Sequence, residues 1–130
     1  MRLFRRRSRW WSVSDAVALV AFAVVGLLSH HGMVTAAGLA HDALPLLGGW
    51  FAAALVFRLY RRPSLSRLLA TWACGVTAGV VIRALVLGRS PNGREAAFLG
   101  VALAFTLLFV LVLRIAVAVT VMRSSSGAAR

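Results

Sequence analysis

The residues that could do chemistry in this sequence are few, and two of them interrupt long apolar stretches. The chain has three acidic residues against fifteen arginines, and it contains no lysine. Asp15 lies near the start of the first apolar segment, and Arg114 lies within the last one. A charged side chain inside a membrane span costs at least ~2.5–3.5 kcal/mol unless it is paired or hydrated. We therefore expect Asp15 and Arg114 to form an intramembrane pair, which is either a structural clamp or part of a proton or ion relay. Separate snorkelling of the two groups is the third alternative.

A second group of polar residues flanks the other ends of the apolar segments. Arg83 follows Gly75 and Gly79 at four-residue spacing, which places all three on one face of a helix. A Gly-x-x-x-Gly stripe favours close contact between helices. We therefore expect Arg83 to meet a neighbouring helix end, with His30 as the main contact. The predicted cluster consists of Ser29, His30, Asp42 and Arg83, and the predicted helix-packing positions are Gly26, Gly75 and Gly79.

Neither a metal site nor an active site is predicted. His30 and His31 are adjacent, so their side chains would diverge by about 100° on a helix, and their spacing to His41 matches no ligand motif. A glycine-rich phosphate loop, a nucleophile elbow and paired intramembrane acids are all missing. Ser29 beside His30 is not a catalytic pair without an orienting partner and an oxyanion site. We therefore expect no enzyme activity and no cofactor.

Composition indicates which elements must position these residues. The chain is 61% hydrophobic, with a mean hydropathy of +0.87, which is typical of an integral membrane protein. Residues 96–113 are uncharged and long enough, at 1.5 Å per residue, to cross most of a ~30 Å hydrocarbon core. We predict an all-α bundle of four transmembrane helices. The expected spans are 13–29, 44–60, 65–87 and 95–122, between a basic N-terminus, 1–12, and a flexible tail, 123–130.

The distribution of arginine predicts the orientation. If the four spans alternate, twelve arginines fall on the side of the termini and three on the other. Because positive charge accumulates on the cytoplasmic side of membrane proteins, we expect both termini to lie in the cytoplasm. We expect the protein to reside in the plasma membrane. A signal peptide cleaved near Thr35 is the competing interpretation, and cleavage would remove Asp15. Four arginines are expected to contact anionic lipid headgroups: Arg58, Arg61, Arg62 and Arg67. The alternative is that these arginines only fix the orientation of the spans.

Several of these residues occur in the order found in one known family. Asp15, Ser29-His30, the segment 45–50 (PLLGGW), Arg83 and Arg114 together resemble a family of small four-span proteins of actinobacteria and some archaea. That family is catalogued as domain of unknown function 3054. The resemblance covers roughly residues 13–116. The chain departs from the family pattern at Leu46 and Leu113, where an aromatic residue is common. The resemblance implies a fold but no activity.

The sequence favours a structural function over a chemical one. Short loops, small-residue stripes and the lack of reactive motifs indicate a small structural or accessory membrane subunit. Its expected partners are the bilayer with its anionic headgroups, and a membrane protein or further copies of itself. The net charge of +12 lies at span ends, so nucleic acid is not an expected partner. The alternative is a small transporter or channel for a proton, ion or amphiphile. Small multidrug exporters have a similar size, but they usually place their acid nearer the bilayer centre than Asp15.

Overall fold

The structure, a computed structural model, describes residues 2–90 and 92–128. This part of the chain forms four helices and no strand: α1 (Arg2–His31), α2 (Ala36–Val56), α3 (Leu65–Val86) and α4 (Gly93–Gly127). Each helix contains a segment that is long and apolar enough to cross a membrane. The predicted all-α fold with four transmembrane helices is therefore confirmed. The four candidate spans are Arg9–His30, Ala36–Val56, Leu65–Val86 and Ala96–Gly127.

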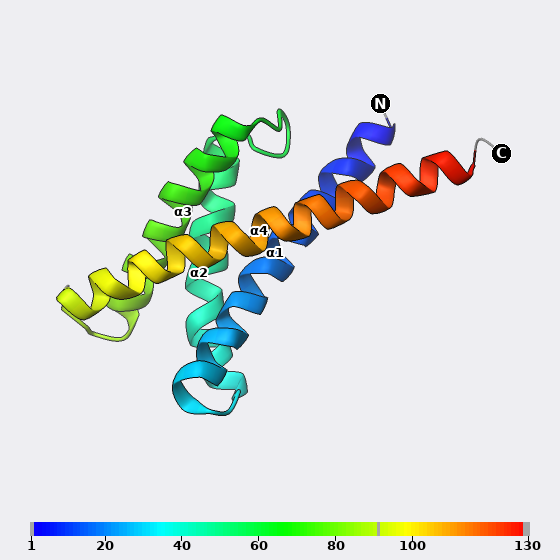
Figure 1. The fold of residues 1–130 in the computed structure, drawn as a ribbon. Coiled ribbons are helices and arrows are strands. Elements are labelled where there is room, and N and C mark those ends of the chain that lie inside the picture. Colours follow the sequence, from blue (N-terminus) through cyan, green and yellow to red (C-terminus); the bar gives the residue numbers. More distant parts are fainter. Residues whose placement is uncertain (1, 91, 129–130) are drawn as a thin grey trace.

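The helices run alternately up and down (Figure 1). Each packs against its neighbours in sequence, and α1 also packs against α4. The two chain ends and the α2–α3 connection lie at one end of the molecule, which we call the terminal end. The α1–α2 and α3–α4 connections lie at the opposite end, the loop end. In Figure 1, α1 and α4 cross near their middles and diverge toward the loop end.

The α2–α3 interface is the most extensive contact between helices, and glycines make it close. Gly49 of α2 lies against Gly75 and Gly79 of α3. A Cβ atom on Gly49 would overlap the Gly75 carbonyl oxygen and would lie 2.6 Å from the Gly79 nitrogen. A Cβ on Gly79 would lie 2.8 Å from the Leu46 Cα. The two backbones therefore touch directly, as the Gly75–Gly79 stripe led us to expect.

Gly26 does not have the packing role that the sequence suggested. A Cβ atom there would find nothing within 4 Å. The four-residue spacing between Gly26 and His30 defines a face of α1, but that face borders a cavity instead of another helix.

Several helix boundaries differ from the prediction. α1 begins at Arg2, within the predicted basic N-terminus, and α2 ends at Val56 instead of residue 60. α2 begins at Ala36, about eight residues earlier than expected, because the Thr35 hydroxyl caps it by accepting a hydrogen bond from the Gly38 amide at 3.1 Å. Asp42 therefore lies on a helix and not in a loop.

α4 continues through Arg123 to Gly127, where we predicted a flexible tail. The serines in this last part donate to carbonyls one turn back, as Ser124 does to Thr120 and Ser126 to Met122. Bonds of this type satisfy the hydroxyls, and the segment stays helical although such bonds slightly destabilise a helix.

Candidate functional sites at the two ends of the bundle

Asp15 and Arg114 meet in a bidentate ion pair toward the terminal end. Arg114 donates from Nε to Oδ1 of Asp15 at 2.9 Å and from a terminal nitrogen to Oδ2 at 2.6 Å. Asp15 is 0% exposed, and the Arg114 side chain is 12% exposed. The Arg114 guanidinium also lies 4.9 Å from the ring centre of Trp11, in cation–π geometry. Both charges are thus compensated within the protein, as their cost in an apolar environment requires.

Two further residues complete this cluster, and sequence reasoning missed both roles. The Tyr60 hydroxyl donates to Oδ2 of Asp15 at 2.7 Å and accepts from Nε1 of Trp50 at 3.0 Å. Trp50 is fully buried. Burial raises the pKa of Tyr60 above its ordinary value, and the negative charge of Asp15 raises it further. Tyr60 therefore remains a protonated donor, and the chain Trp50–Tyr60–Asp15–Arg114 links α2, α1 and α4.

The end of α2 explains how Tyr60 reaches Asp15. Arg58 adopts a positive φ of 53°, a conformation more usual for glycine, and its amide donates to the Leu55 carbonyl. The next amide, that of Leu59, donates to the Ala54 carbonyl, which completes a Schellman motif. The motif turns the chain so that Leu59 is 0% exposed and Tyr60 follows it toward α1.

The arginines predicted to face lipid headgroups separate into two kinds. Arg58, Arg61 and Arg62 are exposed. Arg67 is half-buried, and its guanidinium donates to the Phe57 carbonyl at 3.0 Å. That carbonyl lies at the end of α2, where helix acceptors lack intrahelical donors. Arg67 therefore has a structural role in joining α2 to α3.

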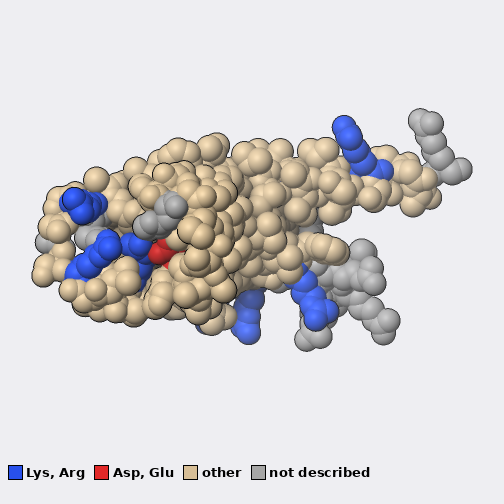
Figure 2. Space-filling model, turned by 90° about the horizontal axis from the view of Figure 1, so that it is seen from below, with Lys and Arg blue, Asp and Glu red and all other residues tan. Residues whose placement is uncertain are grey.

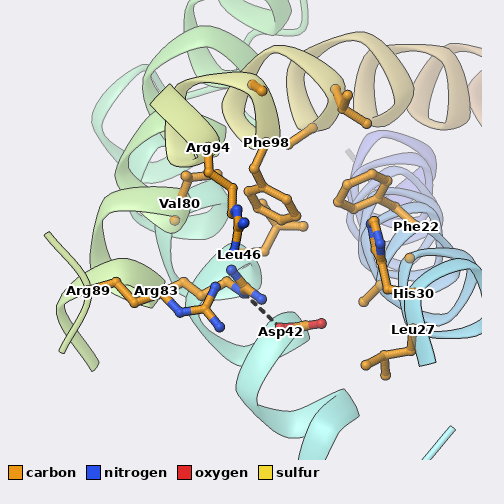
Figure 3. Close-up of a pocket in the computed structure, with 16 residues that line it drawn as sticks. Phe22, Leu27, His30, Asp42, Leu46, Val80, Arg83, Arg89, Arg94 and Phe98 are labelled. Carbon is orange, nitrogen blue, oxygen red and sulfur yellow. Dashed lines mark hydrogen bonds and ion pairs between the residues drawn. The ribbon is translucent and has the colours of Figure 1, made fainter. Parts of the chain in front are cut away.

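At the loop end, Arg83 pairs with Asp42 and not with His30. Nε of Arg83 donates to Oδ1 of Asp42 at 2.7 Å. The Arg83 guanidinium also lies 4.6 Å from the ring centre of Phe98 on α4. The early start of α2 places Asp42 on the helix face that α3 packs against, so the carboxylate lies nearer to Arg83 than the imidazole does. His30 lies on α1, across the space from this pair (Figure 3).

Ser29 does not join the cluster. Its hydroxyl donates to the Val25 carbonyl of its own helix at 2.8 Å. Among the side chains that the structure describes, no three from His, Cys, Asp or Glu are grouped so that they could hold a metal ion.

A cavity of about 580 Å³ opens between the four helices at the loop end. Its volume lies within the ~300–1,000 Å³ range of ligand pockets. The inner walls are mostly apolar, and polar side chains gather at one end of the cavity (Figure 3). A second space of about 510 Å³ shares Asp42, Arg83 and Arg89 with it. The polar residues that line the main cavity are His30, Asp42, Arg83, Arg89 and Arg94.

The loop end is hollowed, and basic side chains surround the hollow. Figure 2 views the molecule from below and shows blue arginines beside a red acidic side chain at the end where α4 begins. The described residues at this place are Arg83, Arg89 and Arg94 with Asp42. Of these, Arg83 is engaged with Asp42, and Arg94 makes no side-chain contact to a described carboxylate.

These features define a class of protein. Four apolar helices, a buried ion pair in the bundle and a polar cluster at the loop end describe a multi-pass membrane protein. A family model matches residues 12–117, and the chain belongs to that family, described as protein of unknown function (DUF3054). The resemblance predicted from sequence is thereby confirmed. No curated protein and no solved structure matches the chain.

Proposed function

We propose that this protein is a small structural or accessory subunit that packs through α4 against a helix of another membrane protein. The observation that carries the proposal is a stripe of small residues on the outward face of α4: Ala96, Gly100 and Ala104. All three are exposed, and a Cβ atom on Gly100 would find nothing within 4 Å. Within this chain, the stripe of Gly75 and Gly79, which has the same four-residue spacing, is covered by α2 at Gly49. Such stripes allow helix backbones to approach closely in a membrane, where packing drives association.

The burial of the helices supports the choice of α4. In the most apolar 18-residue segment of α4, only 17% of the residues are buried, whereas 39% are buried in the corresponding segment of α1. Large side chains such as Phe105 and Leu108 extend the exposed face of α4. A helix of another protein could therefore approach the backbone of α4 closely and also pack against the large apolar side chains beside the stripe.

Replacing Gly100 by Leu should abolish this association while the protein itself stays folded. Overpacking a close contact costs ~1–3 kcal/mol, so we expect retention of the partner to fall about tenfold or more. The measurement is purification from native membranes in mild detergent, with quantitative mass spectrometry of retained proteins and the molar mass of the complex. Gly48→Leu is the matched control, because Gly48 is also exposed with nothing within 4 Å of its Cβ.

The comparison between the two variants decides the outcome. A stoichiometric protein that is lost only in Gly100→Leu supports the proposal. A complex made only of copies of this chain would replace the accessory role by self-association. Identical behaviour of wild type, Gly48→Leu and Gly100→Leu would contradict it.

The second candidate function is a small transporter or channel, and the loop-end cavity is the observation that favours it. Asp15 does not line that cavity, and it is held by Arg114 and Tyr60. A transport role would therefore have to use His30 or the arginines of the loop end. Flux of protons, ions or an amphiphile in proteoliposomes that falls in His30→Ala would favour this function over the first. No catalytic residue is proposed.

We also propose that both termini lie in the cytoplasm and that the protein resides in the plasma membrane. The arginine bias supports this orientation, since Arg83, Arg89 and Arg94 are the only described arginines at the loop end. A reporter that works only in the cytoplasm should be active when it is fused after Arg130, and a reporter that works only in the periplasm should be inactive there. Periplasmic activity of that fusion would overturn the orientation.

A further inference from the structure

We infer that the loop-end cavity binds one anionic phospholipid, with an acyl chain between the helices and the phosphate at Arg83 and Arg94. The inference does not depend on the accessory role proposed above, because it concerns a different surface. It also differs from headgroup contact by Arg61 and Arg62, which lie toward the terminal end. Three features carry it: the apolar walls, the charge at the cavity mouth, and the side from which the cavity is accessible.

The apolar part of the cavity suits a hydrocarbon chain. The rings of Phe22 on α1 and Phe98 on α4 face the same space (Figure 3). Leu46, Val80 and Ala102 close its inner part and are buried. Gly26 leaves room on the α1 side, because no heavy atom lies within 4 Å of its Cβ position. Lipid tails are as apolar as these side chains, so an acyl chain can occupy the space without leaving apolar surroundings.

The mouth of the cavity carries an excess of positive charge. Arg83, Arg89 and Arg94 line it together with one acidic residue, Asp42. Even with Glu95 included, the loop end has three arginines and two acids, so a net positive charge remains there. Arg83 is already oriented by Asp42 and by the Phe98 ring, and Figure 3 shows the Arg94 guanidinium pointing toward it. Guanidinium groups in such an arrangement bind phosphate oxygens with charge-assisted hydrogen bonds.

The position of the cavity favours a lipid over a soluble anion. It lies where α1 and α4 diverge toward the loop end, and Val101, which lines it, is 51% exposed. In a membrane, an exposed side chain at this place faces acyl chains, so a lipid can enter sideways between α1 and α4. Its headgroup would then lie at the level of the helix ends, beside the arginines.

The experiment uses full-length protein, stripped of lipid in detergent and titrated with phosphatidylglycerol or phosphatidylcholine while native mass spectrometry counts bound lipids. We expect one phosphatidylglycerol to bind at least about tenfold more tightly than phosphatidylcholine. Arg94→Gln should lower that affinity about tenfold, because a hydrogen bond to a charged group is lost. Arg94 is exposed, so the substitution should leave the fold intact. Arg61→Gln with Arg62→Gln removes charge at the other end and serves as the control.

A second variant tests the acyl-chain part independently. Gly26→Leu fills the cavity, whereas Gly48→Leu adds the same side chain at an open position outside it. Only Gly26→Leu should reduce phosphatidylglycerol binding. The inference fails if both lipids bind equally, or if only the Arg61 and Arg62 substitutions reduce binding. It also fails if Gly26→Leu has no effect, or if water-soluble glycerol phosphate competes as well as the lipid does.

Discussion

Asp15→Asn should sharply lower the amount of folded protein recovered from membranes. The substitution removes the charge that compensates Arg114, whose side chain is only 12% exposed. Removing one partner of a buried ion pair costs ~3–5 kcal/mol, because an uncompensated charge is left behind. We expect a lower yield and a strongly reduced melting temperature in detergent, measured by tryptophan fluorescence or size-exclusion chromatography after heating.

Other variants of the same cluster show how much each of its side chains contributes to stability. Tyr60→Phe keeps the ion pair but removes one donor to Asp15 and the acceptor of Trp50, so its effect should be smaller, about 1–3 kcal/mol. The double variant Asp15→Leu with Arg114→Leu should recover much of the loss, because apolar residues often replace buried pairs at little cost. Arg61→Gln, at an exposed site, is the control. Near-normal yield and melting temperature for Asp15→Asn would contradict a structural clamp.

The sequence could predict the members of this pair for a physical reason. Charged residues in long apolar segments are few, and an arginine within a span has only a small number of acids to meet. Asp15 and Arg114 lie at similar distances from the terminal end when the spans alternate. Trp50 and Tyr60 gave no comparable signal. Trp50 lies within its span, where it only adds apolar bulk, and an aromatic residue such as Tyr60 at a span end is common without specific contacts. The position of Tyr60 depends on the positive φ of Arg58, which nothing in the residue type indicates.

At the loop end, the sequence predicted the position of Arg83 but neither its partner nor the cavity. The spacing of Gly79 and Arg83 predicted a basic group at a close helix contact, and the structure places it there. Its partner depended on whether Asp42 lay in a loop or on a helix, and Thr35 is a weak sequence signal for a helix start. The cavity could not be predicted at all, because it results from the divergence of α1 and α4 and from the space beside Gly26. Such a space is a property of helix crossing and not of any residue pattern.

The second large effect is expected at two adjacent glycines of α2. Gly49→Ala should destabilise the protein by about 3 kcal/mol, because the added methyl group would overlap the Gly75 carbonyl oxygen and the Gly79 nitrogen. These are backbone atoms, so the only relief is separation of α2 from α3, which would loosen the most extensive helix contact.

Gly48→Ala should have the opposite sign. Gly48 is exposed, and its Cβ position has nothing within 4 Å, so the substitution adds helix propensity of up to ~1 kcal/mol without a clash. The two variants have the same composition and differ only in which face of α2 receives the methyl group. Melting temperatures in detergent should therefore fall for Gly49→Ala and stay level or rise for Gly48→Ala. Equal melting temperatures would mean that α2 and α3 do not meet along this glycine face. Because Gly79 lies one turn before Arg83, a looser α2–α3 contact should also move Arg83 away from Asp42 and weaken the polar cluster at the loop end.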